Sequence, residues 1–407
     1  MKKRIYLFLL LVLIFILSPI FIRYLLIKKK IKVLNSFYFN FPGIINSKTI
    51  CPNYISLLEK SLDRTYSVSI INEKGKIIAS YNDDQPRVPA SNQKLFSSAY
   101  VLSQYKLNNN LKTKLLKSNN NDYYLVGQGD PDLSYLDIYK LLSNIKKSKN
   151  INFYIVEIDS KFYWPEGWTS SDKKYEFGAP ITTLAIESNN NKNDNIYTLN
   201  IAIEDYIKNK FPNSNIRTNN IDSKKLFYIN KYKEIDKVIS NPIISLLTLM
   251  NSESHNFTAE SLFKNASNTW NENKYDKLGK WLRNKGLPLE NTHFADASGL
   301  SRSNKVTSNL IALFLDKMKY SKDFKTYQST LSILGVRGTL ANQLTDSELT
   351  GKFFGKTGTL SNVFALSGYL YKDNKSLIIS IIQNSEVIDK EKAFNLLSDI
   401  YHLKSCD

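Results

Sequence analysis

A serine and a lysine stand one helical turn apart at positions 91 and 94, inside the stretch VPASNQKLFSSAYVL. On a helix, residues i and i+3 project from the same face, so their side chains can meet. A serine hydroxyl is a weak nucleophile until a base removes its proton, and lysine is such a base only as the neutral amine. Burial and a second cation both lower the pKa of a lysine. The pair Ser91 and Lys94 is therefore a candidate for nucleophilic catalysis by an activated serine.

The spacing by itself does not establish this chemistry. Taken in isolation, Ser91 is better explained as the N-cap of a helix, with Lys94 on the solvated face. The pattern Ser-x-x-Lys occurs six times, starting at Ser91, Ser103, Ser143, Ser170, Ser171 and Ser261. Ser-x-Asn occurs five times, starting at Ser80, Ser118, Ser148, Ser188 and Ser254, and Lys-Thr-Gly occurs once, at 356–358.

The setting distinguishes one copy of each motif from the others. Ser91 begins a helix with apolar residues on one face, and Ser254-His255-Asn256 falls inside the stretch 241–264, which we predict to be helical. The single Lys-Thr-Gly leads directly into a predicted strand near the C-terminus. These three segments are therefore the candidates for one site.

The elements that must position these residues follow from the hydrophobic periodicity. Residues 66–82 alternate apolar and polar around the turn at 73–76, which predicts a β-hairpin. Strands on both sides of a helical middle part predict an α+β core, in which terminal helices cover one antiparallel sheet. The other predicted elements are helices from Ser91, over 241–264 and up to Leu403, and strands over 363–371 and 376–383.

Residues 106–239 differ from the rest of the chain. Breaks rich in asparagine and lysine separate short predicted strands, such as DYYLVGQGD and NFYIVEIDS. We expect residues 106–239 to form a smaller, β-rich inserted subdomain. The main domain is then discontinuous and consists of residues 45–105 and 240–407.

The first 32 residues form a separate segment. Ile5 to Ile22 carry no charge over 18 residues, which as a helix spans roughly 27 Å, close to the hydrocarbon thickness of a bilayer. Bulky residues follow where a signal peptidase needs small ones. We therefore predict an N-terminal membrane anchor at 1–32, favoured over a cleaved signal, with the chain exported from about residue 45 onward.

The net charge is +18, from 55 basic and 37 acidic residues. The lysines are spread along the chain, and no arginine-rich arm or zinc-finger spacing is present, so we expect a basic solvated surface and no nucleic-acid partner. The three histidines are scattered, which argues against a metal site. An exported protein with two cysteines can form a disulfide, and Cys51 and Cys406 are the candidates; spacing alone leaves the pairing open.

Six ordered segments together resemble one known family. The trio Ser-x-x-Lys, Ser-x-Asn and Lys-Thr-Gly is typical of penicillin-binding proteins, and the longer context resembles the D-alanyl-D-alanine carboxypeptidase/endopeptidase family, the class C low-molecular-mass penicillin-binding proteins. The resemblance covers residues from about 50 to 400. Its segments are PASNQKL (89–95), LVGQGDPDLS (125–134), MNSESHNFTAE (250–260), FADASGLSR (294–302), GVRGTL (335–340) and GKTGTLSNVFALSGY (355–369).

The resemblance implies a fold and a set of roles. The fold is the penicillin-binding-protein/β-lactamase-like transpeptidase fold, in which an antiparallel sheet with terminal helices on one face adjoins an all-helical part. Ser91 is the nucleophile, Lys94 its base, and Lys356 the second cation in the same cleft. Ser254 passes a proton to the leaving amine, and Asn256 holds the substrate amide and contacts Lys94.

The Lys-Thr-Gly strand is expected to bind substrate. Lys356, Thr357 and Thr359 fit a dock for the terminal carboxylate of D-Ala-D-Ala, and Gly358 lets the substrate backbone lie against the strand edge. The backbone N–H groups of Ser91 and Thr359 form the oxyanion hole that the family implies.

The remaining motif residues are expected to be structural. Asp296, Ser298 and Gly299 shape a loop, and Arg302 contacts substrate or lies on the surface. The sequence departs from the family at three positions outside the catalytic roles, and these put the helix contacts around Ser254 in doubt: His255 replaces an aspartate, Ala297 a glycine and Arg337 an acidic residue.

The predicted function is a serine-type D-Ala-D-Ala carboxypeptidase that cuts peptidoglycan stem peptides without a cofactor, on the periplasmic side of a bacterial cytoplasmic membrane. Cleavage of cross-links as an endopeptidase is a further possibility that the sequence leaves open. β-Lactam antibiotics would acylate Ser91. Two alternatives remain: a β-lactamase, for which we identify no deacylating glutamate, and a catalytically silent peptidoglycan-binding scaffold.

Overall fold

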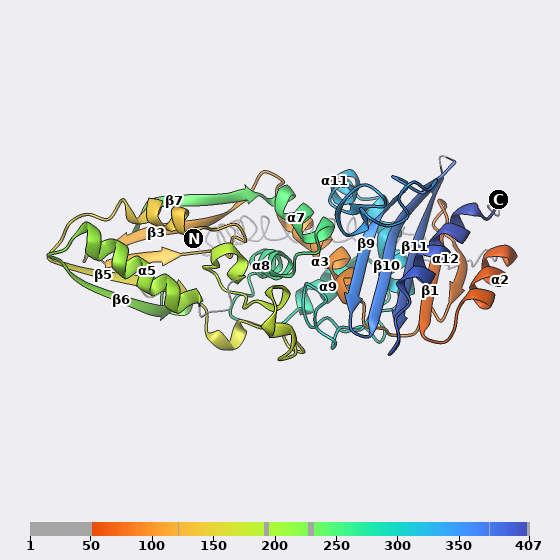
Figure 1. Ribbon diagram of the computed structural model, residues 1–407, viewed down its shortest axis with the longest axis horizontal. Helices are drawn as coiled ribbons and strands as arrows, with labels where there is room; N and C mark the ends of the chain where they lie inside the picture. The colour runs from red at the N-terminus through yellow and green to blue at the C-terminus, as the bar shows by residue number, and fades with distance from the viewer. Residues whose placement is uncertain (1–50, 121, 191–194, 227–231, 374, 405–407) are drawn as a thin grey trace, which may run out of the picture. The chain divides into compact units, whose positions relative to one another are not determined.

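The computed structural model describes residues 51–120, 122–190, 195–226, 232–373 and 375–404 (Figure 1). Residues Lys48–Asp407 form one compact unit. The predicted membrane segment, residues 1–32, lies outside the described residues. None of the helices in the described ranges is both long and apolar enough to cross a membrane.

The first sheet combines strands from both ends of the chain. In the described residues it has the order β2-β1-β11-β10-β9-β8, and every pair is antiparallel. The predicted hairpin and the two predicted C-terminal strands are confirmed. The strands are β1 (Tyr66–Ile71), β2 (Ile77–Tyr81), β8 (Ser332–Ile333), β9 (Phe353–Leu360), β10 (Val363–Lys372) and β11 (Lys375–Asn384).

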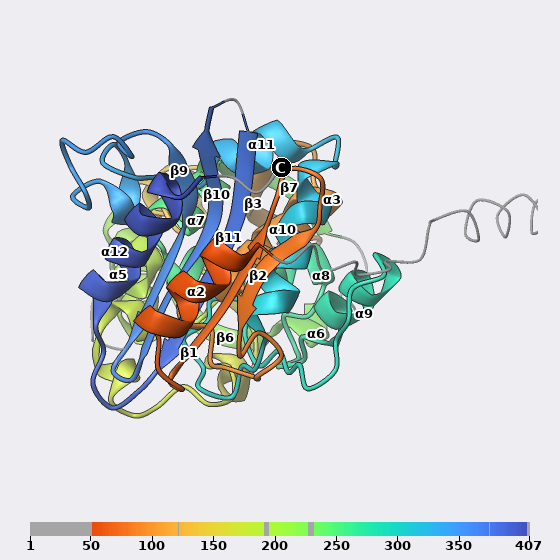
Figure 2. The same cartoon turned by 90° about the vertical axis from the view of Figure 1, so that its right-hand side faces the viewer.

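The terminal helices cover one face of this sheet, as predicted. Helices α2 (Pro52–Ser61) and α12 (Lys390–His402) lie side by side in front of β1, β10 and β11 (Figure 2). Their apolar residues, Leu58 and Leu397 among them, share one buried cluster with the sheet. β1 is buried at every position and β10 at nearly all of them, because helices pack on both faces of the sheet.

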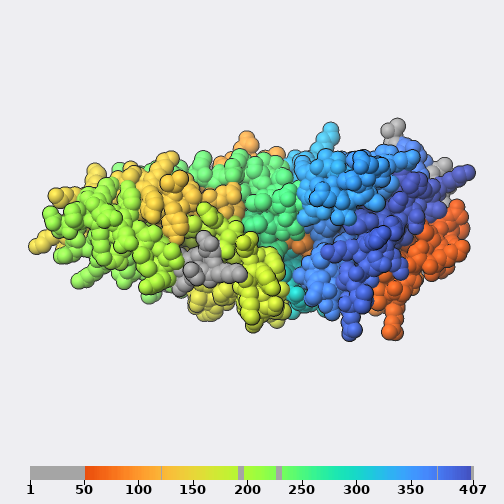
Figure 3. All heavy atoms as spheres, in the orientation of Figure 1, coloured from red at the N-terminus to blue at the C-terminus, as the bar shows by residue number. Residues whose placement is uncertain are grey.

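Cys51, the first described residue, is one of the two cysteines of the predicted disulfide. Cys51 is buried at the N-cap of α2 and is disulfide-bonded. The predicted partner, Cys406, lies outside the described residues, so the pairing itself stays a prediction. In the space-filling view, α2 lies beside the C-terminal helix α12 (Figure 3).

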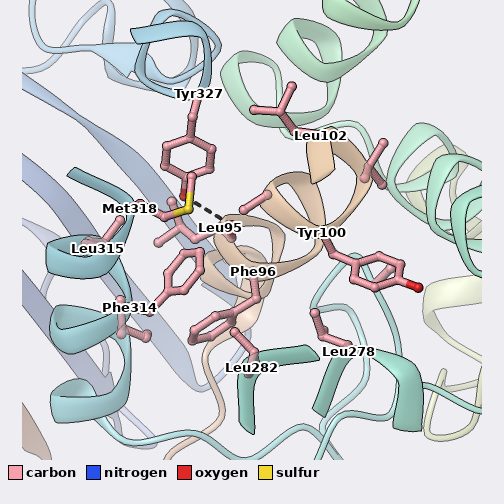
Figure 4. Close-up of a cluster of buried hydrophobic side chains, with 14 of the residues drawn as sticks. Leu95, Phe96, Tyr100, Leu102, Leu278, Leu282, Phe314, Leu315, Met318 and Tyr327 are labelled. Atoms are coloured by element: carbon pink, nitrogen blue, oxygen red, sulfur yellow. Dashed lines mark hydrogen bonds between the residues drawn. The ribbon is translucent and has the colours of Figure 1, made fainter. Parts of the chain in front are cut away.

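The opposite face of the sheet carries the helices that position the candidate nucleophile. Helix α3 (Gln93–Gln104) is buried from Gln93 to Leu102, and Figure 4 shows its side chains enclosed by the neighbouring helices. The Tyr327 hydroxyl donates to the Leu95 carbonyl at 3.1 Å. A helix buried on all sides cannot shift without disrupting the core, so α3 is a rigid support. Its neighbours include α8 (Asn256–Ser267), α9 (Asp276–Asn284), α10 (Ser308–Lys319) and α11 (Phe324–Ser329).

The predicted continuous helix over 241–264 is wrong. Helix α7 (Ile243–Ser252) ends before Glu253, and α8 starts at Asn256. Between them Ser254 has φ 62°, in the left-handed region that a helix cannot contain. The motif Ser254-His255-Asn256 therefore lies at a helix–helix junction rather than within a helix.

A second sheet is built from residues 110–242, within or close to the predicted insertion. In the described residues its order is β6-β5-β4-β3-β7, and β4, β5 and β6 are parallel. Helices α4 (Tyr135–Leu142) and α5 (Asn195–Lys210) share its main apolar cluster, so this part is mixed α/β rather than only β. The predicted domain boundaries stay a prediction. The strands are β3 (Asn110–Ser118), β4 (Asp122–Val126), β5 (Asn150–Glu157), β6 (Asn215–Asp222) and β7 (Tyr232–Pro242), and α6 (Ser223–Leu226) follows β6.

Candidate active site

Ser91 lies in a tight turn, Ala90–Asn92, directly before α3. Ala90 has φ 47°, a left-handed conformation that costs energy for a residue with a side chain. Gly299 packs against this turn, and a Cβ atom on Gly299 would lie 1.9 Å from the Ala90 carbonyl oxygen. The turn is further fixed by Asn92, whose Nδ2 donates to Ser367 Oγ on β10 at 2.7 Å. A strained turn held by two other elements thus presents Ser91.

Lys94 is fully buried and faces Ser91. Its Nζ atom lies 3.0 Å from Ser91 Oγ, 2.6 Å from Asn256 Oδ1 and 2.7 Å from the Ser298 carbonyl oxygen. An ammonium has three protons for these three acceptors, whereas a neutral amine has two protons and a lone pair. If the two shorter bonds keep the two protons, the lone pair of the neutral amine points at Ser91 Oγ.

The alternative interpretation of this pair is wrong. Lys94 is not on a solvated face, since none of it is exposed. The N-cap of α3 is Asn92, and no side-chain hydrogen bond caps the helix. The hydrogen bond that Ser91 Oγ accepts comes from Lys94 Nζ, at 3.0 Å.

Burial lowers the pKa of Lys94 to about 7, against the opposing effect of the negative charges of Asp296 and Glu260. Lys356 is also fully buried, and its pKa lies well below the ordinary value because of burial and, second, because of repulsion by Lys94. We expected the second cation to be a cause of the shift at this pair. Burial is the largest cause at both lysines, and repulsion by the other lysine contributes to the lowered pKa of Lys356 but not to that of Lys94. Two buried ammonium groups repel each other, so the state in which both lysines are charged is disfavoured.

Strand β9 brings the Lys-Thr-Gly motif against the Ser91 turn. A Cβ atom on Gly358 would lie 2.8 Å from the Ser91 nitrogen and 2.9 Å from the Pro89 carbonyl oxygen. We predicted that Gly358 leaves room for substrate; the structure adds that it leaves room for the nucleophile turn itself. Lys356 Nζ donates to the Thr357 carbonyl at 2.9 Å.

The two threonines of this strand differ in their surroundings. The Thr357 hydroxyl donates to Thr339 Oγ1 at 2.7 Å. Thr339 belongs to the GVRGTL segment, so that segment supports the strand from the side. Thr359 is exposed and stands beyond Gly358 on the same edge. Thr359 is therefore open to a ligand on β9, whereas the proton of the Thr357 hydroxyl is already bonded to Thr339.

Asn256 starts α8 and uses both ends of its amide. Its Oδ1 accepts from Lys94, as predicted, and its Nδ2 donates to the Phe177 carbonyl at 2.9 Å. Phe177 comes from the inserted part of the chain, 79 residues away. The group expected to hold the substrate amide is therefore already bonded within the protein.

Ser254 and His255 complete the junction before α8. The Ser254 hydroxyl has no hydrogen-bond partner within the described ranges, so it is free to bond a substrate. The His255 side chain caps α8, accepting from the Thr258 N–H through Nδ1. Burial lowers the pKa of His255 to about 4, so the ring is neutral near pH 7 and can accept this bond as the aspartate of relatives would. His255 therefore has a structural role as the cap of α8, and the helix contacts next to Ser254 are kept although the aspartate is replaced.

The loop at 294–302 is shaped by Asp296, as predicted. Its buried carboxylate accepts from the N–H groups of Gly299 and Ser301, both at 2.7 Å, and from Trp168 Nε1 at 2.9 Å. The loop then offers the Ser298 carbonyl to Lys94.

Arg302 and Arg337 form contacts within the protein. Arg302 pairs with Asp172 of the inserted part at 2.5 Å, a structural contact that differs from both of its expected roles. Arg337 donates to the Ser329 and Leu331 carbonyls, at 2.6 and 2.5 Å.

Three residues beside the site were not anticipated from the sequence: Glu260, Trp168 and Phe177. Glu260 accepts from the N–H groups of Ala297 and Ser298 at 2.9 and 2.8 Å. Glu260 lies one helical turn after Asn256 on α8, and this spacing is the sequence feature that could have indicated that Glu260 lies near the site. The other two come from the inserted part, and no local pattern relates them to the site.

Several known proteins resemble this chain in sequence. A model of the D-Ala-D-Ala carboxypeptidase 3 (S13) family matches residues 60–205 and 229–404. The D-alanyl-D-alanine carboxypeptidase DacB of Haemophilus influenzae is 25% identical over 383 residues, covering 73% of this chain and 80% of DacB. A D-alanyl-D-alanine carboxypeptidase of an Actinomadura species is 37% identical over 94 residues, which are 22% of this chain and 18% of that protein.

Solved structures share the fold. Penicillin-binding protein 4 of H. influenzae superimposes with a TM-score of 0.69 at 20% identity, covering 86% of this chain and 100% of that one. The peptidoglycan endopeptidase Bd3459 of Bdellovibrio bacteriovorus gives a TM-score of 0.57 at 17% identity, with 82% and 92% coverage. The fold is thus that of low-molecular-mass penicillin-binding proteins.

The family assignment follows from the sequence match, which extends over most of the described residues. This chain belongs to the D-Ala-D-Ala carboxypeptidase 3 (S13) family of serine peptidases. The resemblance drawn from the six segments is therefore confirmed.

Proposed function

We propose that this protein is a serine-type D-Ala-D-Ala carboxypeptidase that acts on peptidoglycan stem peptides through an acyl-enzyme on Ser91. One observation carries the proposal: Ser91 Oγ lies 3.0 Å from Nζ of the fully buried Lys94, and this Nζ also contacts Asn256 Oδ1 and the Ser298 carbonyl oxygen. This arrangement supplies a base at the nucleophile without a histidine.

Acylation starts with Lys94 as the neutral amine. Lys94 takes the proton of Ser91 while Oγ attacks the carbonyl carbon of the penultimate D-alanine. The N–H groups of Ser91 and Thr359 stabilise the negative charge on the carbonyl oxygen. The peptide C–N bond then breaks, and Ser254 passes a proton from Lys94 to the leaving nitrogen, so D-alanine departs as a neutral amine. Water subsequently hydrolyses the ester and restores Ser91.

Substrate binding favours the active protonation state. The terminal carboxylate of D-Ala-D-Ala docks at Lys356, Thr357 and Thr359, and a carboxylate beside Lys356 stabilises its ammonium form. Because Lys356 and Lys94 repel each other as cations, a charged Lys356 favours a neutral Lys94. Binding of the carboxyl-terminal end of the peptide thereby favours the neutral form of Lys94, which is the form that accepts the Ser91 proton.

The two alternatives are less well supported. A β-lactamase needs a base for rapid deacylation, and the oxygens of the buried Glu260 are already bonded to Ala297, Ser298 and Tyr275. A silent scaffold has no need of a fully buried lysine hydrogen-bonded to a serine. Penicillins acylate Ser91 and remain bound, in keeping with a relative, penicillin-binding protein 4, whose structure was solved with a β-lactam.

The location and the range of substrates are also part of the proposal. Residues 1–32 anchor the enzyme in the bacterial cytoplasmic membrane, and the remainder works on peptidoglycan on the periplasmic side. The inserted residues 106–239 limit which cross-linked peptides enter, and some of these are cut in an endopeptidase reaction.

Full-length protein in detergent, incubated with pentapeptide and with cross-linked muropeptides, tests the proposal. We expect release of D-alanine from the pentapeptide, and none from the Ser91→Ala variant. A fluorescent penicillin separates the alternatives: a stable label is expected, rapid release of the label would indicate a β-lactamase, and a folded protein that takes no label would indicate a scaffold.

A further inference from the structure

Helix α8 carries a second buried group that the proposed reaction does not use. Glu260 is 0% exposed. One of its oxygens accepts from the N–H groups of Ala297 and Ser298, at 2.9 and 2.8 Å, and the other accepts from the Tyr275 hydroxyl at 2.8 Å. No lysine or arginine forms an ion pair with it in the described part of the chain.

Burying a carboxylate such as that of Glu260 destabilises the folded protein. A buried carboxylate without a paired cation loses its hydration, and only hydrogen bonds compensate for it. An apolar side chain or a glutamine at this position would avoid that loss. The placement of Glu260 therefore calls for a role that its charge and its hydrogen bonds can serve.

The position of Glu260 links the two elements that hold Lys94. Asn256, one helical turn earlier on α8, gives Lys94 its first acceptor, and the Ser298 carbonyl gives the second. Glu260 binds the N–H of Ser298 itself, so it fixes the distance between α8 and the loop. The lone pair of Lys94 points at Ser91 only while both acceptors keep their places.

We propose that Glu260 is a positioning residue for acylation, which holds the two acceptors of Lys94 together and whose negative charge strengthens Lys94 as a base. This inference rests on the proposed function. The ionisable groups that interact with Glu260 are Asp296, Tyr275, Lys264 and Lys94. Asp296 is already bonded to several N–H donors of its own loop and the indole of Trp168.

The charges around Lys94 determine the direction of the effect. Burial lowers the pKa of Lys94 to about 7, while the negative charges of Asp296 and Glu260 act to raise it. Burial and the negative charge of Asp296 raise the pKa of Glu260 itself to about 7, so the charge that Glu260→Gln removes is the one present above that pH. Its loss lowers the pKa of Lys94 further. A lower pKa makes the neutral amine available at more acidic pH but makes it a weaker base, which slows proton transfer from Ser91.

The test is the acylation rate of full-length protein by a fluorescent penicillin between pH 5 and pH 9. For Glu260→Gln we expect the maximal rate to fall by about tenfold or more, and the midpoint of the pH profile to move to lower pH by about half a unit. A wild-type midpoint, or a shift to higher pH, in a folded Glu260→Gln protein would overturn the inference. A residue that only stabilised the fold would leave the midpoint unmoved.

The chain provides a matched control. Glu157 is also buried, and its carboxylate accepts from the N–H groups of Ile158, Thr183 and Leu184, but it does not act on Lys94. Glu157→Gln makes the same chemical change in a buried glutamate. We expect the wild-type midpoint in that variant, whatever its thermal stability.

A second variant covers the case in which Glu260→Gln fails to fold. Glu260→Asp keeps the charge but is one methylene shorter, so it cannot reach both Tyr275 and the loop. We expect a lower maximal rate with a nearly unchanged midpoint, and a full wild-type rate would overturn the positioning role. If the wild-type protein itself is not acylated, the proposed function fails; if it is acylated and the Glu260 variants match it, only this inference fails.

Discussion

The close packing of Gly358 on the Ser91 turn predicts the consequence of one added methyl group. In Gly358→Ala the new Cβ would lie 2.8 Å from the Ser91 nitrogen, 2.9 Å from the Pro89 oxygen and 3.0 Å from Ala90 Cβ. Ordinary carbon contacts are at about 3.5 Å or more, so β9 and the turn must separate by roughly half an ångström. Two of the three contacts are backbone atoms, which cannot rotate out of the way.

The expected fall in the acylation rate follows from how strongly acyl transfer depends on the positions of the reacting atoms. A displacement of about 1 Å at a reacting group costs on the order of a hundredfold in rate, so we expect acylation of Gly358→Ala by a fluorescent penicillin to slow by roughly tenfold or more. Overpacking of this kind also destabilises a protein by about 1–3 kcal/mol. The thermal midpoint should therefore fall together with the acylation rate.

Gly279→Ala is the control for this experiment. Gly279 lies in α9, and a Cβ there would come no nearer than 3.7 Å, to Phe294. Alanine favours a helix over glycine by about 1 kcal/mol, so this variant should keep its acylation rate and be at least as stable as the wild type. If Gly358→Ala acylates at the rate of Gly279→Ala with an unchanged thermal midpoint, the close packing of β9 on the Ser91 turn is not what the site requires.

Three further predictions follow from the site. Because the pKa of Lys94 is about 7 and only the neutral amine accepts a proton, acylation should rise with pH and reach half its maximum near pH 7; a rate independent of pH from 5 to 9 would contradict this role. Thr339→Val removes the partner of Thr357, so KM for a D-Ala-D-Ala peptide should rise about fivefold with kcat little changed, whereas an unchanged KM would mean that the bond does not orient Thr357. His255→Asp should keep the cap of α8 and wild-type stability, while His255→Ala should lose about 1 kcal/mol in denaturant unfolding; equal losses in both variants would disprove the capping role.

The parts of the site that follow local rules could be predicted from the sequence. Ser91 and Lys94 are one helical turn apart, and Lys356 to Thr359 lie on one strand, so short-range geometry fixes how these residues face. The terminal helices and the antiparallel sheet likewise follow from hydrophobic periodicity. The order of the motifs then identified the family.

The parts that depend on distant contacts could not be predicted. The contact of Asn256 with the Phe177 carbonyl joins residues 79 positions apart, and that of Glu260 with Ala297 joins residues 37 apart. No periodicity encodes such pairs. The helix over 241–264 was predicted as continuous because apolar residues recur on both sides of the junction, whereas the left-handed Ser254 that breaks it leaves no hydrophobic signal.

The position of the acyl group tests the central claim most directly. Full-length protein is incubated with penicillin, digested and analysed by mass spectrometry, with Ser91→Ala as the control. The account predicts one penicilloyl group per chain, on the peptide that contains Ser91, and no such group on folded Ser91→Ala. A penicilloyl group on a different serine, or a folded wild-type protein that stays unmodified, would contradict it.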